Sequence, residues 1–283
     1  MSIIKLLDEF TSENLTKKTS SRREMFGTLG SFSKKAALAA VPFGLASTGS
    51  AKAATFFQDA NSAVDALQLA LTLEYLEAEY YMMALESGVL MADSKAEAVF
   101  MQISKHETAH VNFLVTNLEA AGVEPVAKPT FDFTVGGMFD PFNENGIGQE
   151  TAMAQLLVLA QAFEDTGVRA YKGQAANLMG TPYLEPALQI HSVEARHASQ
   201  VRRLRGLKGW ITLDNRGEGM PEATQPVYNG EAEVVQAGVD LTTLDYGDSA
   251  IVGDVAVAAS QAFDEPLTGD EAVAIASLFI VTE

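Results

Sequence analysis

Two segments of the chain share the spacing Glu-x-x-His, and each lies in a stretch that predicts a long helix. Glu107 precedes His110 by three residues in "KHETAHVNFL", and Glu194 precedes His197 by three in "HSVEARHASQ". Residues three apart on a helix share a face, so each pair directs a carboxylate and an imidazole toward the same point. One such pair arises readily by chance, whereas two copies in a chain with 4 histidines indicate a metal site.

The apolar pattern predicts four long helices. Apolar residues recur every three or four positions over the ranges 61–87, 94–121, 150–179 and 183–209. The first two segments contain neither Pro nor Gly and stop at Gly88 and Gly122. Between the second and third segments, residues 123–149 are too many for a tight turn and suit a crossover along a bundle. We therefore expect an all-α fold, with a four-helix bundle over residues 54–210.

An internal repeat extends the Glu-x-x-His pairs to all four helices. Glu74 is followed seven residues later by Tyr81, and Glu164 is followed seven residues later by Tyr171. Seven residues are two helical turns, so each Glu and its Tyr face the same way, toward the apolar interior. Together with the two Glu-x-x-His pairs, this gives four inward carboxylates and two inward imidazoles. Because the chain has no cysteine, we expect an oxygen and nitrogen cage for two divalent ions.

This ligand pattern resembles the ferritin-like superfamily of di-iron and di-manganese carboxylate proteins. In that superfamily, two helices each supply one Glu and two others each supply a Glu-x-x-His pair. The resemblance covers about residues 60–210. The stretch "AFDEPLTGDEAVAIASLF" near the C-terminus also looks like the tail of a narrower group, the bacterial exported ferritin-like domain proteins of the desiccation-related type.

The resemblance implies six metal ligands: Glu74, Glu107, His110, Glu164, Glu194 and His197. The two isolated glutamates would be terminal ligands, the two glutamates of the Glu-x-x-His pairs would bridge the ions, and each imidazole would bind one ion. Tyr81 and Tyr171 fall where the family often places a tyrosine near the metals, which implies a catalytic role. The alternative is that each is a packed aromatic side chain with a satisfied hydroxyl.

Two functions are compatible with such a site. In the first, two Fe or Mn ions react with O2 or H2O2, as in an oxidase, a ferroxidase or a peroxide-consuming enzyme. In the second, the chain is a non-catalytic stress or desiccation-related protein that uses the bundle structurally. A complete set of six ligands favours the first function.

Three further residues stand near the repeat. His106 lies about 100° around the helix from Glu107, which predicts a surface or interface position. His191 lies one turn before Glu194 on the same face, where an auxiliary role at the site stays open. Glu77 lies one turn after Glu74 and is either another carboxylate at the site or an ordinary solvated side chain. Its counterpart in the second half of the repeat is Gly167.

The first 53 residues predict an export signal. Arg22 and Arg23 precede a mildly apolar run over residues 36–46, and Ala51-Lys52-Ala53 follows as a small-x-small cleavage pattern. The segment resembles a twin-arginine signal, which implies a periplasmic or extracellular location. A soluble basic extension is the alternative. The apolar run is far shorter than the ~20 residues of a spanning helix, so we expect no stable membrane anchor.

Charge and the C-terminal segment complete the expectations. The chain carries a net charge of −18, which disfavours binding to nucleic acid, and assembly into a homo-oligomer stays open. Residues 211–283 are expected to form an extension to the bundle. Thr268-x-x-Glu271 before an apolar run predicts a capping box and a short final helix. Residues 214–262 show no sustained period and could pack on the bundle or form an interaction surface.

Overall fold

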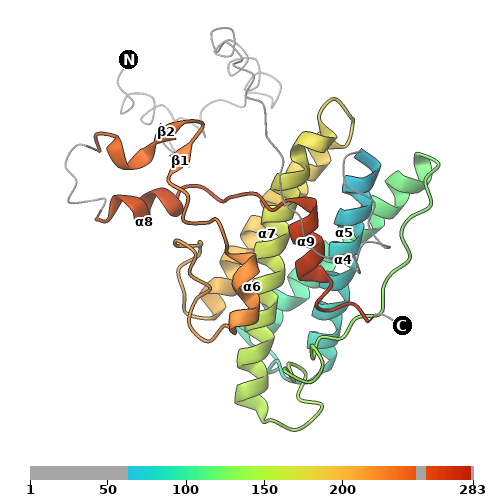
Figure 1. Cartoon of the computed structure of the whole chain (residues 1–283). Helices are drawn as coiled ribbons and strands as arrows, with labels where there is room; N and C mark the ends of the chain where they lie inside the picture. Colours follow the sequence, from blue (N-terminus) through green and yellow to red (C-terminus); the bar gives the residue numbers. More distant parts are fainter. Residues whose placement is uncertain (1–62, 247–252, 282–283) are drawn as a thin grey trace, which may run out of the picture. The chain divides into compact units, whose positions relative to one another are not determined.

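The computed structural model describes residues 63–246 and 253–281. Four long helices dominate this part of the chain (Figure 1): α4 (Ala63–Glu86), α5 (Lys95–Ala120), α6 (Gln149–Gln174) and α7 (Leu184–Leu204). The expected all-α fold is confirmed. The predicted export signal, residues 1–53, lies outside the described residues, as do the first residues of the predicted bundle domain.

The helices pack as two hairpins, α4 with α5 and α6 with α7, and α4 also lies against α6. This arrangement follows from the connections. The turns within each hairpin are short, so each helix packs on its sequence neighbour, while the connection from α5 to α6 is long enough to return along the bundle.

Glycines in the left-handed region end two of these helices. Gly122 (φ 74°) follows α5, and the next N–H, that of Val123, donates to the Leu118 carbonyl at 2.9 Å. Gly206 (φ 76°) ends α7 in the same way, so this helix stops at Leu204 rather than near the predicted residue 209. The predicted third helix, residues 150–179, is α6 followed by the 3₁₀ helix η2 (Ala175–Leu178).

The crossover between α5 and α6, residues 121–148, runs along α4. The Val126 N–H donates to the Gln68 side chain at 2.7 Å near the start of α4. Lys128 forms an ion pair with Glu79, three turns further along the same helix. The predicted long crossover is therefore confirmed, and it is fixed to α4 by polar contacts at two levels.

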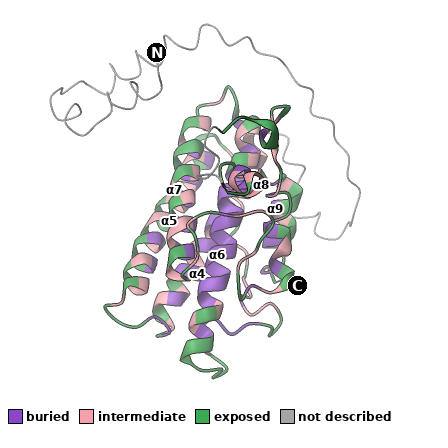
Figure 2. Cartoon of the chain, turned by 90° about the vertical axis from the view of Figure 1, so that its left-hand side faces the viewer, coloured by how far each residue is buried: buried purple, intermediate pink, exposed green. Residues whose placement is uncertain are grey.

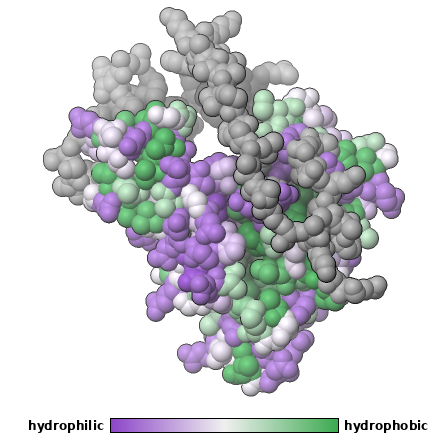
Figure 3. Space-filling view, viewed as in Figure 1, coloured by the Kyte–Doolittle hydropathy of each residue, from purple (hydrophilic) through white to green (hydrophobic). Residues whose placement is uncertain are grey.

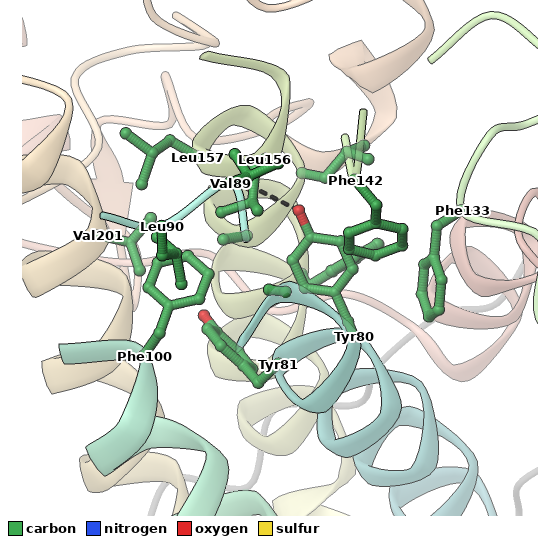
Figure 4. Packing of buried hydrophobic residues seen from close by; sticks show 14 of the residues in the cluster. Tyr80, Tyr81, Val89, Leu90, Phe100, Phe133, Phe142, Leu156, Leu157 and Val201 are labelled. Atoms are coloured by element: carbon green, nitrogen blue, oxygen red, sulfur yellow. Dashed lines mark hydrogen bonds between the residues drawn. The ribbon is translucent and has the colours of Figure 1, made fainter. Parts of the chain in front are cut away.

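Aromatic residues of the crossover then enter the core. Phe133 and Phe142 pack against Tyr80 with ring centroids 5.1 and 5.6 Å apart (Figure 4). The Tyr80 hydroxyl donates to the carbonyl of Leu156 on α6 at 2.6 Å, the dashed line in Figure 4. This packing stabilises a loop that has no regular secondary structure of its own.

The central part of helix α6 is buried on all sides. Every residue from 156 to 171 is buried, which is visible as the continuous purple stretch of α6 in Figure 2. Helices α4 and α7 cover part of its surface. The C-terminal extension covers another part through an apolar cluster made of Val158, Ala162, Ile211, Met220, Val227, Tyr228, Leu267 and Ile275. The extension therefore packs on the bundle through these residues and adds to its core.

The extension contains only short elements: η3 (Glu222–Val227), β1 (Val235–Gln236), β2 (Val239–Asp240), η4 (Leu241–Thr243), α8 (Val255–Ser260) and α9 (Gly269–Ala276). Strands β1 and β2 pair antiparallel. The predicted capping box is confirmed at the start of α9, where Thr268 and Glu271 exchange side-chain to backbone hydrogen bonds. Helix α9 packs its two buried alanines, Ala272 and Ala276, with residues of α4 and α6.

Arg169 on α6 binds the extension at four points. Its Nε donates to the Glu265 carbonyl at 2.7 Å, Nη2 donates to the Asn229 carbonyl at 2.8 Å, and Nη1 donates to the Val227 carbonyl. The Glu231 carboxylate lies 2.8 Å from Nε and supplies the counter-charge. Arg169 is fully buried, so these partners replace the water that the guanidinium loses.

Some hydrophobic side chains remain on the surface. In the view of Figure 3 they gather over the β1–β2 hairpin, where Val235 and Val239 are exposed, and over α8. Within the two described ranges, no helix combines the length and the hydropathy that a membrane span requires.

Candidate metal centre

The six predicted ligands converge in the middle of the bundle from four helices. They form two overlapping groups, and within each group one ligand atom per residue lies within 4.8 Å of all the others. The first group contains Glu74, Glu107, His110 and Glu194, and the second contains Glu107, Glu164, Glu194 and His197. All four carboxylates are 0 % exposed. The pattern found in the sequence therefore corresponds to one compact cluster in the fold.

Glu107 and Glu194 belong to both groups because each directs its two oxygens in two directions. Glu107 places Oε2 3.1 Å from His110 Nδ1 and Oε1 2.9 Å from His197 Nδ1. Glu194 places Oε1 3.1 Å from His110 Nδ1 and Oε2 3.7 Å from His197 Nδ1. Each of these carboxylates can therefore offer one oxygen to each of two neighbouring ions.

The other two carboxylates each face a single imidazole. Glu74 Oε2 lies 3.2 Å from His110 Nδ1, and Glu164 Oε2 lies 3.3 Å from His197 Nδ1. Glu74 and Glu164 thus occupy the outer positions of the cluster, on α4 and α6.

The two tyrosines of the repeat hold these outer carboxylates, but in crossed pairs. Tyr81 on α4 donates to Glu164 Oε1 on α6 at 2.5 Å, and Tyr171 on α6 donates to Glu74 Oε1 on α4 at 2.5 Å. Each hydroxyl therefore binds the glutamate of the other hairpin rather than the one seven residues before it. Both tyrosines contact candidate ligands, as a role at the site would require. Both also have satisfied hydroxyls, as the alternative of a packed aromatic side chain would require.

The polar atoms at the centre of the cluster fit a pair of cations. Five buried atoms make no hydrogen bond of regular geometry, although they lie within ion-pair distance of one another or of His110: Glu107 Oε1, Glu164 Oε2, both oxygens of Glu194, and His197 Nδ1. Buried charges without partners are costly, and four carboxylates match the charge of two divalent ions. Oxygen and imidazole donors without thiolate suit Fe or Mn.

Mutual repulsion and burial perturb the protonation of this cluster. Burial raises the pKa of Glu107 well above its usual range, with Glu194 raising it further, and burial raises the pKa of Glu164 to about 7. Burial alone would raise the pKa of Glu194, but close contacts with His110 and His197 lower it to about 2. Burial alone would lower the pKa of His110, but its contacts with three glutamates raise it to about 12. In the metal-free cluster, the protons on His110 and His197 thus offset part of the carboxylate charge.

Glu77 is a further carboxylate at the cluster, so the solvated reading of this residue is wrong. It is 2 % exposed, and burial, followed by the charge of Glu194, raises its pKa well above the usual range. A Cβ atom at Gly167 would lie 3.1 Å from Glu77 Oε1 and 3.4 Å from Glu194 Oε2. The glycine at the equivalent position of the repeat therefore leaves the space that Glu77 uses.

His106 is partly exposed, which agrees with the predicted surface or interface position, and it also contacts a candidate ligand, which the sequence did not predict. It is half-buried, and its Nδ1 lies 2.8 Å from Nε2 of His197. The angle from Glu107 was a poor guide because the relevant neighbour on α5 is His110. Residues four apart on a helix share a face, so the 106/110 spacing could have indicated this position.

His191 belongs to neither group of candidate ligands. Its Nε2 is buried without a hydrogen-bond partner, and burial lowers its pKa, with Asp264 acting in the opposite direction. The structure therefore brings His191 close to the C-terminal extension rather than into the cluster of six.

A four-helix bundle with two overlapping groups of buried carboxylates and imidazoles defines a class of proteins suited to a dinuclear metal site. The family model of the ferritin-like domain matches residues 62–207, slightly more than half of the chain, and the protein belongs to that family. No curated protein matches the chain.

Proposed function

We propose that the protein binds two Fe or Mn ions in this cluster and uses them in oxidase, ferroxidase or peroxide-consuming chemistry. The observation that carries the proposal is the sharing of Glu107 and Glu194 by both groups of candidate ligands. When reduced ions are bound by these residues, they would supply the electrons for the reduction of O2 or H2O2. These small molecules are the substrates we propose.

The protein side chains would have separate tasks in this chemistry. Glu107 and Glu194 would each offer one oxygen to each of the two ions, because each carboxylate has one oxygen directed to each group of candidate ligands. Tyr81 and Tyr171 orient the outer carboxylates through their hydroxyls and are the side chains we propose to assist catalysis. Apolar residues such as Phe100 and Leu76, both buried, belong to the same core cluster as Tyr81 and keep bulk water away from it.

Metal content tests the site directly. Purified protein loaded with Fe(II) or Mn(II) is expected to hold about two ions per chain, as the shared-carboxylate pattern requires. The double variant His110→Ala/His197→Ala removes one nitrogen donor from each group and should lose most of this metal. Elemental analysis after gel filtration measures the difference. Equal metal in the two proteins would show that the cluster is not the binding site.

Reactivity tests the function. The Fe(II)-loaded protein is expected to oxidise iron on mixing with O2 or H2O2 faster than iron in buffer, and stopped-flow absorbance follows the reaction. Glu107→Ala removes one shared carboxylate and should slow it strongly. If this variant oxidises iron as fast as the wild type, the reaction belongs to iron in solution. The function would then be that of a non-catalytic stress or desiccation-related protein.

We also propose that the protein acts outside the cytoplasm, as an exported ferritin-like protein. The support is the sequence of residues 1–53, with Arg22 and Arg23 ahead of a weakly apolar run. N-terminal sequencing of the protein from the cell envelope should find a start near Ala54, and Arg22→Lys/Arg23→Lys should block export. Intact protein that begins at Met1 in the cytoplasm would contradict this proposal.

A further inference from the structure

His106 reaches from α5 to the candidate ligand His197 on α7. Its Nδ1 lies 2.8 Å from Nε2 of His197, and the two rings are nearly parallel (14°), with their centroids 5.1 Å apart. The other nitrogen of His106 lies 2.7 Å from the side-chain amide of Gln102, one turn earlier on α5. His106 is therefore held between the surface and the cluster by polar contacts through both ring nitrogens.

The orientation of His197 determines what His106 can do. His197 directs Nδ1 toward Glu107 and Glu164, at 2.9 and 3.3 Å, and so directs Nε2 toward His106. An imidazole that binds a cation through Nδ1 carries its proton on Nε2. We place the proton of His106 on Nε2, where the Gln102 amide, turned so that its oxygen faces the ring, accepts it. Nδ1 of His106 then accepts the proton of His197 Nε2, which fixes both the tautomer and the plane of the His197 ring. Partners of this kind typically change metal affinity about 10- to 100-fold.

The other half of the cluster lacks such a partner. His106 directly precedes Glu107, and the equivalent residue before Glu194 is Val193, which has no polar side-chain atom. Among the described residues, His110 makes polar contacts only through Nδ1, with Glu74, Glu107 and Glu194. Its side chain is 12 % exposed, against 5 % for His197. The two imidazoles thus differ in their support and in their access to solvent, although the six candidate ligands follow a near-symmetric repeat.

We propose that His106 is a positioning residue that makes the two metal positions unequal. The position beside His197 binds its ion more tightly and fills first, and the position beside His110 fills second and exchanges more readily. This inference rests on the proposed dinuclear site and adds an order of filling, which the repeat in the sequence would not predict.

Calorimetric titration of the metal-free, full-length protein with Mn(II) tests the inference without any measurement of activity. The wild type should show two steps, with the first tighter than the second. His106→Ala should weaken the tighter step about 10- to 100-fold, so that the two steps merge. His106→Asn keeps an acceptor close to the place of Nδ1 and should restore part of the difference. The neighbouring exposed residue Lys105 supplies the control, since Lys105→Ala should leave both steps unchanged.

The outcomes separate this inference from the proposed function. If the wild type binds no Mn(II) at all, the dinuclear site itself is wrong. If it binds two ions with equal affinity, or if His106→Ala keeps two distinct steps, the site stands and the role of His106 is refuted. Thermal melts of the metal-free variants show whether they are folded. If His106→Ala does not fold, His106→Asn takes its place in the test. A folded His106→Asn variant that binds both ions with equal affinity would also refute the role.

Discussion

Glu77 and Gly167 occupy equivalent positions in the two hairpins, three residues after Glu74 and Glu164. One position carries a buried carboxyl group and the other has no side chain, and the space left by the second accommodates the first. The repeat is therefore symmetric in its six candidate ligands and asymmetric beside them. Glu77 adds a fifth carboxyl group to a region that already concentrates negative charge.

Replacing Glu77 with Gln should stabilise the metal-free protein at neutral pH. The pKa of Glu77 is raised in the folded state, so its ionisation opposes folding above its unfolded value of 4.5, and glutamine does not ionise. The gain should be absent near pH 4.5 and should grow as the pH rises above it, because raising the pKa by one unit corresponds to about 1.4 kcal/mol. Thermal melts in EDTA between pH 5 and pH 8 measure it, with the exposed Glu86→Gln as the matched control. Lower stability of Glu77→Gln at pH 8 would mean that a partner compensates the carboxylate.

The crossed tyrosines give a second prediction for single residues. Tyr81→Phe leaves Glu164 Oε1 without its donor, and Tyr171→Phe does the same to Glu74 Oε1. Each variant should lose about 1.5–3 kcal/mol of stability, the usual value for a hydrogen bond to a charged group, and the two losses should be similar. Chemical denaturation measures them. Tyr80→Phe is the comparison, because its hydroxyl binds a backbone carbonyl and a smaller loss of about 1 kcal/mol is expected there. Equal losses for all three would mean that the carboxylates are not charged.

At the level of elements, α6 depends on the chain segment that crosses it before α9. The Leu267 N–H donates to the Arg169 carbonyl at 3.0 Å, while Arg169 Nε donates back to the Glu265 carbonyl. The Leu267 carbonyl then lies so close to Gly173 that a Cβ atom there would be 1.8 Å from its oxygen. Gly173 is thus required by a backbone approach from a segment almost a hundred residues later.

Gly173→Ala should therefore destabilise the protein, against the usual preference of helices for alanine. In an open helix this change stabilises by about 0.5–1 kcal/mol. Here the clash with backbone must displace the segment around Leu267, at a cost of about 1–3 kcal/mol or more. The control is Ala98→Gly at an exposed position of α5, where alanine should be the better residue. Denaturant unfolding of both variants measures the change in the free energy of unfolding, which should be a loss in each case. A more stable Gly173→Ala variant would show that this segment does not pack on α6.

For the whole molecule, the cluster predicts opposite pH dependences with and without metal. Without metal, the raised pKa of Glu164 contributes stability that is complete below 4.5 and is lost as the pH rises to about 7, a change of about 3 kcal/mol. The raised pKa of His110 contributes stability that is complete below pH 6.5, the unfolded value, and is lost as the pH rises above it. The lowered pKa of Glu194 acts only below 4.5, so it does not alter this window.

Bound cations should reverse this trend, because they replace protons on the imidazoles and carboxylates and bind more tightly as the pH rises. The melting temperature measured in EDTA should therefore fall from pH 5 to pH 8. The increase in melting temperature that Mn(II) causes over EDTA should become larger over the same range. The exposed-site variant Lys105→Ala should follow the wild type in both series. A melting temperature that changes with neither metal nor pH would mean that the buried charges are neutralised within the protein.

The sequence alone determined those features that depend on local spacing along one helix. Apolar periodicity located the four helices, the Thr268 capping box located the start of α9, and the Glu-x-x-His pairs located the two positions where carboxylates are shared. The end of α7 at Gly206 is also a local effect, although the predicted range of this helix ran on to residue 209. Each of these features arises within a few turns of chain, so residue spacing is sufficient to predict it.

Only the tertiary structure decided the features that depend on how the helices are rotated and aligned against each other. The crossing of Tyr81 and Tyr171, the burial of Glu77 against Gly167, and the contact of His106 with His197 all join different helices. Arg169 finds its partners in residues 227–265, a region without a periodic pattern. Spacing within a helix fixes which residues share a face, but the rotation and axial shift that bring two faces into contact come from packing of the whole core.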